Sequence, residues 1–593
     1  MKINYNNFDP RELGINIKRS LRLLWETSRP IAAWSFVLHI VQALLPVASL
    51  YVIKILVDQV TNKSSFSEVV PTMIIFLAIQ LLLAMVQQYI NHITTIFQLK
   101  LTDHLSQKVL NKAIAVDYDY YENPDYHNSL HLAQQQSFFR AGILLTSFNS
   151  FITSGFALLF LLLLFISMQS FFALLFIAFS IPLAIIKWYF GIAIMQQERK
   201  LAPLEREAGY LHQILTGVSF AKDTRVFGFG NYFIAKFMTI RNNILLQKQG
   251  LNKKLTAYSL MAESVEIIAM AIIFALLAKQ SIQGAISLGL FVIYIQGFQS
   301  LQTNSKNFLQ SIVQILHQRV FLQDLFAFLD IKLRTQTNPL PFPKVKTGLS
   351  ISNLSFRYPS TEKEVLHQIS MRCKPGQVIA IVGENGSGKS TLIKLLAKLY
   401  QSDSGTIRFD ETELNNINNE DYRKQSVFLF QDFEKYFFTI EENIVLGNAD
   451  AAKYKEEIVQ AARSSGADGF INKLSKSYQT RMGSIFEGST QLSGGEWQKL
   501  ALARIFYRKD AKLIVLDEPT SALDAQAEYD IFNQIKAMAI DKMVILITHR
   551  LYNLKMANYL YVMQEGRIAE QGEFNELIVK GGLFTKLFNM QQI

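Results

Sequence analysis

The sequence predicts two parts: an all-α transmembrane domain of six helices with long cytoplasmic stalks, followed by an α/β domain. Long apolar segments fill the first half of the 593 residues, where charged residues are sparse. Half of all residues are hydrophobic and 18% are charged, which is typical of a chain with a membrane-embedded part. From residue 349 onward, short apolar runs alternate with helical patterns, as in an α/β domain.

Residues 1–30 predict an amphipathic elbow before the first span. Between residues 16 and 25, apolar side chains lie on one side, and Lys18, Arg19 and Arg22 lie on the other. Such a helix suits a membrane surface, although an ordinary surface helix has the same pattern. The polar residues 1–8 lack the apolar core of a secretory signal. We therefore expect the N-terminus in the cytoplasm.

Six apolar segments are long enough to cross a membrane, for which about 20 residues suffice. They are 31–60, 69–86, 142–168, 171–195, 257–278 and 286–309. The three short connections hold only Lys63 and Lys279 as basic residues, whereas the long connections 87–141 and 196–256 are rich in Lys, Arg and His. The positive-inside rule then places both long connections and both termini in the cytoplasm. The net charge of +11 agrees with loops that face anionic lipid.

The helical pattern of the second span continues to about residue 115. At about 1.5 Å per residue this is roughly 70 Å, against a ~30 Å hydrocarbon core, so the excess predicts a cytoplasmic stalk. The fourth, fifth and sixth helices extend likewise, the sixth to about residue 330. Turns at 120–127 and 217–230 would close the stalk tips. These tips resemble docking knobs, and simple loop tips are the alternative.

Several polar residues fall within the predicted spans. Glu263 and Glu266 share a helix face, and Gln296, Gln299 and Gln302 recur every three residues. Since polar groups at membrane depth avoid lipid, we hypothesise that these residues line a polar pathway. Contacts between helices, or a position in cytoplasmic water, would explain them as well.

Residues 383–390 fit the phosphate-binding pattern G-x-x-x-x-G-K-[ST]. The residues are Gly383, Glu384, Asn385, Gly386, Ser387, Gly388, Lys389 and Ser390. The apolar run 378–382 reads as a strand before them, and Thr391 opens a helix after them, which is the context that this loop requires. Lys389 can reach the β- and γ-phosphates, and the Ser390 hydroxyl can bind Mg²⁺. The sequence therefore predicts a nucleotide site that uses ATP and Mg²⁺.

Other candidate residues follow apolar strands. Gln431, the Asp517–Glu518 pair and His549 each come directly after such a strand. Asp517 could hold Mg²⁺, and Gln431 could touch Mg²⁺ or the attacking water. Glu518 could polarise that water, and His549 could contact the γ-phosphate. Each residue alone is more often structural.

Two further features complete the pattern. Ser493, Gly494 and Gly495 precede a helix and form a second anion site. Tyr358 could stack on adenine, although such aromatics are more often core residues. The proline-containing residues 336–348 read as a linker. The predicted domains are then the elbow 1–30, the transmembrane domain 31–335, the linker 336–348 and the P-loop nucleotide-binding domain 349–593.

Together and in this order, the motifs resemble the nucleotide-binding domain of ABC transporters. Tyr358 matches the A-loop, residues 383–390 the Walker A motif and Gln431 the Q-loop. Residues 492–498 match the signature, with Glu496 where Gln is commonest. Asp517 and Glu518 match Walker B with the catalytic glutamate. Residues 521–524, with Asp524, match the D-loop, and His549 matches the switch histidine. The six-span half resembles long-stalk, type IV exporters.

The resemblance implies an ATPase coupled to transport, with ATP held between the Walker A motif of one nucleotide-binding domain and the signature of another. One copy of each motif implies a half-transporter in a bacterial inner membrane. The resemblance implies a homodimer, and a heterodimer with a related chain is the alternative. It implies membrane lipid and exported cargo as partners, and no nucleic acid.

Local strings at 429–433, 492–504, 120–126 and 221–227 resemble bacterial exporters of lantibiotic and other ribosomally made peptides. Some members carry an N-terminal cysteine peptidase. Since about 30 residues without cysteine precede the first span, we expect no leader cleavage by this chain. A multidrug or lipid exporter is the alternative, and an ABC ATPase with a regulatory role is a more remote one.

Overall fold

The computed structural model describes residues 10–590 except positions 123, 169, 335, 337, 360, 451 and 453. The polar residues 1–8, and position 123 in the predicted turn at 120–127, lie outside the described residues. The same holds for the side chains of 124–129, and for those of 170–184 in the predicted fourth span. The chain divides into two compact units, Met1–Ala115 with Asp125–Ile331, and Val116–Pro124 with Lys332–Ile593. The predicted first tip therefore groups with the α/β unit.

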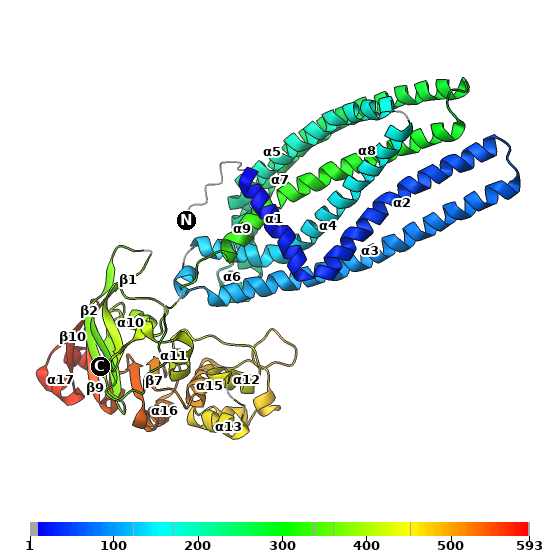
Figure 1. The fold of residues 1–593 in the computed structure, drawn as a ribbon. Coiled ribbons are helices and arrows are strands. Elements are labelled where there is room, and N and C mark those ends of the chain that lie inside the picture. Colours follow the sequence, from blue (N-terminus) through cyan, green and yellow to red (C-terminus); the bar gives the residue numbers. More distant parts are fainter. Residues whose placement is uncertain are drawn as a thin grey trace. The chain divides into compact units, whose positions relative to one another are not determined.

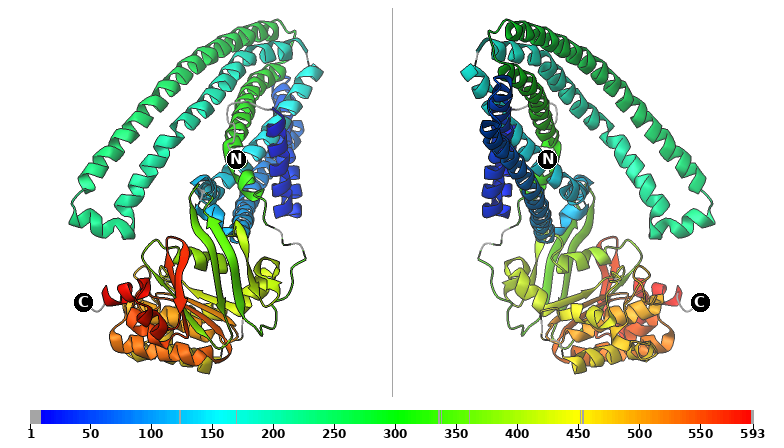
Figure 2. Two further views of the ribbon diagram at one scale, coloured as in Figure 1. Left: turned by 90° about the vertical axis from the view of Figure 1, so that its left-hand side faces the viewer. Right: turned by 90° about the vertical axis from the view of Figure 1, so that its right-hand side faces the viewer.

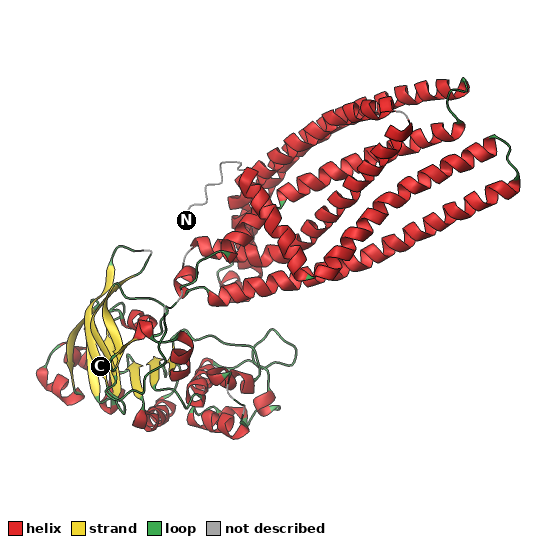
Figure 3. Cartoon of the chain, in the orientation of Figure 1, coloured by secondary structure: helices red, strands yellow, loops and turns green. Residues whose placement is uncertain are grey.

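The first unit is built of helices (Figures 1 and 3). Its long helices are α2 (Arg29–Thr61), α3 (Phe66–Ala115), α4 (Pro124–Met168), α5 (Ser170–Thr216), α7 (Gly230–Ile282) and α8 (Leu288–His317). Its shorter helices are α1 (Pro10–Thr27), α6 (Ala221–Val226) and α9 (Arg319–Leu329). The unbroken α3 confirms the predicted continuous helix to residue 115.

Four helical segments of the described chain are long and apolar enough to cross a membrane. They are Arg29–Thr61, Phe66–Ala115, Gly142–Ser167 and Gly230–Ile282. They contain the predicted first, second and fifth spans and all but the last residue of the predicted third. The predicted sixth span lies in α8 from Leu288 onward, where Gln, Ser, Thr and Asn interrupt the apolar residues.

The long helices pack in pairs. Helix α2 runs beside α3 and α8, and α5 runs beside α7 (Figure 2). In the interior, the ring of Phe165 lies 5.6 Å from that of Tyr294 and 5.0 Å from that of Phe298. A Cβ atom at Gly297 would meet the Phe165 ring at 2.7 Å, so the close approach of α4 and α8 here requires glycine.

The elbow helix α1 is tied to other helices by charge pairs. The Arg19 guanidinium lies 2.6 Å from the Asp330 carboxylate and 4.1 Å from the centre of the Phe326 ring, and Glu26 pairs with Lys108 at 2.8 Å. The predicted sixth helix differs from the structure, because it breaks at Gln318 between α8 and α9. The Arg19 contacts hold α9 against α1.

The second unit has two sheets (Figure 3). The four-stranded sheet has the order β2-β1-β4-β5, with β1 (Leu349–Arg357), β2 (Glu364–Cys373), β4 (Ser404–Phe409) and β5 (Thr412–Glu413). The six-stranded sheet has the order β10-β9-β3-β8-β7-β6, with β3 (Val378–Gly383), β6 (Ser426–Leu429), β7 (Leu513–Asp517), β8 (Met543–Ile547), β9 (Tyr559–Gln564) and β10 (Arg567–Gly572). A core cluster joins residues of both sheets.

Helices complete the second unit. They include α10 (Lys389–Leu396), α11 (Asn419–Gln425), α12 (Ile440–Val445), α13 (Lys455–Ser464), α14 (Asp468–Ile471), α15 (Gly494–Tyr507), α16 (Ala525–Met538), α17 (Phe574–Lys580) and α18 (Leu583–Met590). Strands β3, β8, β7 and β6 pair in parallel, so their carboxyl ends meet at one edge of the sheet. Ligand sites form at this edge in parallel sheets.

Candidate nucleotide site

The phosphate loop leaves β3 and enters α10 at this edge. Glycine is required within it, because Gly386 and Gly388 have φ values of +80° and +101°. A Cβ atom at Gly388 would also meet the Leu366 side chain at 2.7 Å. The loop therefore has the close backbone turn that an anion-binding loop needs.

Lys389 is the buried cation of the loop. Its Nζ atom donates to the carbonyl oxygens of Gly383 at 2.9 Å and Glu384 at 2.8 Å, and its side chain is 6% exposed. Burial lowers the pKa of Lys389, and the carboxylates of Asp517 and Glu518 oppose that shift. When a nucleotide binds, the Lys389 ammonium can exchange these two carbonyl contacts for hydrogen bonds to phosphate oxygens.

Asp517, at the end of β7, is paired with the loop. The Ser390 hydroxyl donates to its carboxylate at 3.3 Å. Burial raises the pKa of Asp517 to about 6, Glu518 adds to the rise, and Ser390 and Lys389 oppose it. A hydroxyl beside a carboxylate is an oxygen donor set that suits Mg²⁺, so these residues fit the predicted metal. The described residues contain no group of three or more His, Cys, Asp or Glu side chains that could hold a metal by themselves.

Glu518 is the point where the other predicted residues meet. The Gln431 amide donates to its Oε2 atom at 2.8 Å, and Nε2 of His549 lies 3.1 Å from its Oε1 atom. Its backbone adopts a left-handed conformation with φ +49°, and its N–H donates to the Ile547 carbonyl at 2.9 Å. A left-handed glutamate is uncommon, and such backbone strain occurs often at functional sites.

Tyr358 lies at the edge of the loop and helix α10. Its hydroxyl is 3.0 Å from the Thr391 hydroxyl, and its ring meets that of Tyr400 edge-on at 5.3 Å. The Lys394 ammonium lies 5.4 Å from the ring centre. Lys394 and Tyr400 therefore pack against Tyr358 beside the first turn of α10.

The predicted first tip contacts this same group of residues. The ring of Tyr118 meets that of Tyr400 at 5.7 Å, and Glu122 pairs with Lys394 at 3.2 Å. Arg334 pairs with Asp119 at 2.7 Å from the start of the predicted linker. The tip therefore contacts Tyr400 and Lys394, and each of these two residues in turn contacts Tyr358. Spacing in the sequence gave no indication of these contacts.

The signature residues stand apart from the phosphate loop. Ser493 caps α15, and its hydroxyl donates to Glu496 at 2.8 Å. A Cβ atom at Gly495 would lie 2.9 Å from the Ala522 carbonyl oxygen. Within the described chain, no hydrogen bond joins 493–495 to 383–391. The predicted signature and the predicted phosphate loop therefore form separate groups of residues within the described chain.

Gln498 connects the signature helix with the acidic end of β7. Its amide donates to the Glu518 carbonyl at 3.0 Å, and its oxygen accepts from the Ala522 N–H at 2.8 Å. The side chain is 2% exposed. In the sequence, only the position of Gln498 within the predicted signature motif, residues 492–498, indicated that it could connect to the site.

A second buried link joins the predicted D-loop region to Arg550, the residue after the predicted switch histidine. Arg550 follows His549 and pairs with Glu528 of α16, whose side chain is 1% exposed. The Thr520 hydroxyl donates to the same carboxylate at 2.7 Å, and Asp524 caps α16 by accepting from the Ala527 N–H at 2.9 Å. Sequence reasoning missed Arg550 and Glu528, because no local pattern pairs them.

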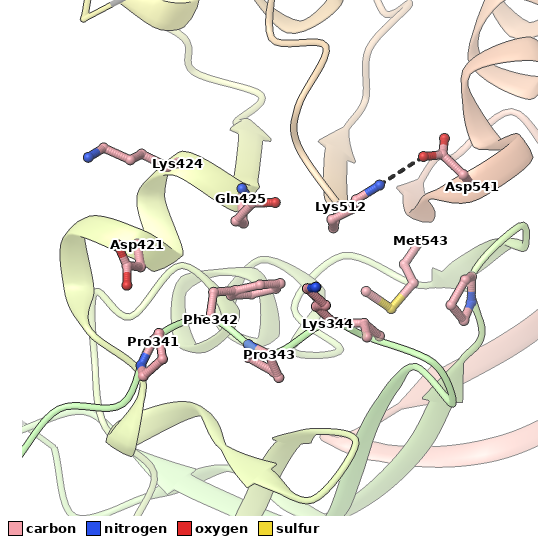
Figure 4. A pocket seen from close by; sticks show the side chains of 12 residues that line it. Pro341, Phe342, Pro343, Lys344, Asp421, Lys424, Gln425, Lys512, Asp541 and Met543 are labelled. Atoms are coloured by element: carbon pink, nitrogen blue, oxygen red, sulfur yellow. Dashed lines mark hydrogen bonds and ion pairs between the residues drawn. The ribbon is translucent and has the colours of Figure 1, made fainter.

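A cavity of about 400 Å³ lies elsewhere in this unit (Figure 4). It is lined by Phe342 and Lys344 of the predicted linker, with Met543 behind them. The Lys512 ammonium at its rim pairs with Asp541 at 2.8 Å. The linker is fastened here, since Leu340 exchanges backbone hydrogen bonds of 2.7 Å with Asn416 and Asn418. None of the predicted site residues lines this cavity.

Comparison with known proteins agrees with the geometry. The family model described as "ABC transporter" matches residues 366–521. Residues 366–521 therefore form an ABC transporter domain. The chain is 28% identical to the nisin transport ATP-binding protein of Lactococcus lactis subsp. lactis, over 98% of this chain and 96% of that protein. It is 29% identical to the subtilin transport ATP-binding protein of Bacillus subtilis, over 96% and 93% of the two chains.

The transporter also has the fold of a solved bacterial Atm1-family ABC exporter with ATP bound. The TM-score is 0.80 at 20% identity, over 95% of this chain and 98% of that one. The predicted class, a half-transporter of the exporter kind, is confirmed, and so are a helical membrane domain and an α/β nucleotide-binding domain. The transporter is membrane-embedded, binds ATP and couples ATP hydrolysis to export.

Proposed function

We propose that the transporter exports a ribosomally made, lantibiotic-like peptide across the bacterial inner membrane. One observation carries this proposal. The similarity to the nisin and subtilin transport proteins extends over the membrane domain as well as the nucleotide-binding domain. The membrane domain is the part that contacts cargo, whereas a nucleotide-binding domain is shared by exporters of any substrate.

The site residues take the following proposed roles. Residues 383–391 hold the phosphates, and Tyr358 stacks on adenine. Asp517 and Ser390 hold Mg²⁺, whose charge would neutralise the developing charge on the phosphate oxygens. Gln431 and His549 orient the Glu518 carboxylate, which polarises the attacking water. Support comes from the distances of 2.8 Å and 3.1 Å that place both side chains on this one carboxylate.

A second copy of the chain would complete each site. Ser493, Gly494 and Gly495 lie on the N-terminus of α15, where backbone N–H groups can bind the γ-phosphate of ATP held by the other copy. Asp524, at the N-terminus of α16, would lie at the same interface. Since both half-sites carry competent residues, a homodimer with two equal sites follows.

The helices supply the proposed coupling. Six spans within α2, α3, α4, α5, α7 and α8 would place the tips and both termini in the cytoplasm, with domains 1–30, 31–335, 336–348 and 349–593. The tip at 116–124 acts on its own nucleotide-binding domain through Tyr400 and Lys394. The tip at 217–230 would meet the second copy at the aromatic surface formed by Tyr436 and Phe438, whose side chains are 44% and 46% exposed.

Reconstituted vesicles with the nucleotide-binding domain outside test the proposal. ATP should drive uptake of a labelled precursor peptide encoded next to the transporter gene, and Glu518→Gln should abolish it. Movement of a labelled lipid or dye without peptide uptake would assign a different cargo. ATP hydrolysis that moves none of the three would favour a regulatory role.

A further inference from the structure

A charged cluster on α7 and α8 has one more carboxylate than ammonium group. Its members are Glu263 and Glu266 of α7 and Lys306 of α8. The Lys306 ammonium lies 3.3 Å from the Glu263 carboxylate, and these two side chains are 29% and 34% exposed. Glu263 is therefore paired with Lys306, while Glu266 adds one further carboxyl group to the cluster.

Glu266 is buried, with a residue exposure of 3%. Among the described residues, its Oε2 atom has no hydrogen-bond partner. Among the described residues, no Lys, Arg or His forms an ion pair with it. A buried, unpaired carboxylate in a membrane domain is unfavourable, so such a residue indicates a functional site.

Other charged and amide side chains of the same domain have partners, although Gln59 Oε1, His104 Nε2 and Gln318 Oε1 also lack a hydrogen bond among the described residues. Lys54 lies 3.8 Å from Asp58, and the Asp58 carboxylate accepts from the Gly289 N–H at 2.9 Å. Gln42 hydrogen-bonds with Gln87 across α2 and α3. The carboxylate of Asp58 therefore has an ion-pair partner within its domain, whereas Glu266 forms no ion pair with any described residue.

The cluster lies deep in the helices. At about 1.5 Å per residue, Glu266 is roughly 24 Å from the end of α7 at Ile282. In a hydrocarbon core of about 30 Å, this depth places it near the cytoplasmic side if Ile282 marks the outer surface. Burial by neighbouring helices argues against the alternative that Glu266 stands in cytoplasmic water.

Amide side chains extend the face of Lys306 along α8. Gln302 precedes Lys306 by one turn and is half-buried, and Gln299 precedes Gln302 by another turn and is exposed. Exposed amides can donate to and accept from a peptide backbone. They continue the same side of the helix toward the opposite end of the span.

We propose that Glu266, together with the Glu263–Lys306 pair, forms the recognition site for a cationic group of the cargo. Lys306 holds Glu263, so one added positive charge balances the cluster. A lysine side chain or a terminal amine of an exported peptide has this charge, and the α8 amides receive its backbone. That the cargo is a peptide rests on the proposed function. That the cargo carries a positive charge rests on the Glu263–Glu266–Lys306 cluster alone.

The test uses the full-length transporter in vesicles and measures the probe concentration that half-maximally stimulates ATP hydrolysis. One probe pair is an amphipathic peptide with a single lysine and the same peptide with that lysine acetylated. A second pair is a lipophilic rhodamine cation and its uncharged dihydro form. The wild type should prefer the charged member about tenfold, the effect of one charge pair worth about 1.4 kcal/mol.

Glu266→Gln should reduce this preference to about twofold or less, with stimulation measured relative to the variant's own basal ATP hydrolysis. Lys306→Gln frees Glu263 and should keep or increase the preference. Glu68→Gln, at the start of α3, is the matched control and should behave as wild type. An unchanged preference in Glu266→Gln, or an equal loss in Lys306→Gln, would overturn the proposal.

The probe pairs separate the two proposals. If the dyes show a preference that depends on Glu266 and the peptides stimulate nothing, the cation site stands and peptide export fails. If the peptides stimulate equally with and without the charge, and the dyes do likewise, the cation site fails. Stimulation by neither pair also overturns the cation site.

Discussion

The Nε2 atom of His549 lies 3.1 Å from the Oε1 atom of Glu518. Burial lowers the pKa of His549, and the Lys389 ammonium lowers it further, against the opposing effect of Glu518. The imidazole is therefore neutral at pH 7, and its proton must be on Nε2 to donate to the carboxylate. With Gln431 on the other oxygen, Glu518 is held in one orientation while keeping its charge for a water molecule.

Replacing Glu518 by Gln should leave ATP binding intact and reduce ATP hydrolysis about 10²-fold or more, because an amide cannot accept the proton of the attacking water. Binding is measured with a labelled nucleotide, and hydrolysis by phosphate release. Glu456→Gln, on the exposed part of α13, is the matched control. Hydrolysis at the wild-type rate would remove Glu518 from catalysis.

Lowering the pH below 6 should raise the KM for the Mg²⁺–ATP complex. Since burial raises the pKa of Asp517 to about 6, this carboxyl is protonated below that pH and cannot ligate Mg²⁺. The KM for the complex, corrected for protonation of ATP in solution, should rise about tenfold per pH unit below pH 6. A KM that is constant between pH 5 and 7 would contradict the assignment.

The same pKa has a consequence for stability without nucleotide. A carboxyl whose pKa is raised on folding favours the folded state when protonated. The contribution of protonated Asp517 to the free energy of unfolding is fully present below about pH 4 and is lost as the pH rises through about 6. Thermal unfolding of Asp517→Asn should therefore depend less on pH than that of the wild type over this range.

The tip residue Glu122 should affect ATP binding. It pairs with Lys394, whose ammonium lies 5.4 Å from the centre of the Tyr358 ring. We expect Glu122→Lys and Lys394→Glu each to raise the KM for ATP by about two- to fivefold, since a partly exposed pair contributes up to about 1 kcal/mol. The double exchange should restore the pair and the KM. An unchanged KM in Glu122→Lys would disconnect the tip from the adenine site.

Arg550 should matter for stability. Removing it takes the guanidinium partner from the Glu528 carboxylate, which is 1% exposed, at a cost of about 3–5 kcal/mol. Arg550→Met should therefore lower the unfolding temperature strongly, and the double variant Arg550→Met with Glu528→Leu should recover much of the loss. Equal unfolding temperatures for Arg550→Met and wild type would show that the pair adds no net stability.

The sequence predicted the elements and residues that depend on local pattern. Strand β3, the phosphate loop and helix α10 follow from an apolar run, three glycines and a lysine within a few positions. Gln431, Asp517 and His549 were found because each follows a strand, and parallel strands bring such residues together at one edge.

Contacts between distant segments could not be predicted in this way. The Glu122–Lys394 pair and the Arg550–Glu528 pair depend on how elements pack, and neither partner has a local signature. The break at Gln318 was missed because the apolar pattern continues through it, while the Arg19–Asp330 pair holds α9 in place. The local sequence likewise gives no sign that Glu266 Oε2 has no hydrogen-bond partner among the described residues, because this depends on packing.

Mixing two defective chains tests most directly whether the nucleotide site is shared between two copies. Lys389→Ala disables the phosphate loop. Gly494→Asp blocks the signature, and its own chain has room for the new side chain because the nearest atom to an added Cβ is Ala522 Cβ at 4.0 Å. Each variant alone should be inactive. Dimers that contain one of each, isolated through two tags, retain one intact site and should hydrolyse ATP at about half the wild-type rate. Mixed dimers as inactive as the parents would contradict a shared site.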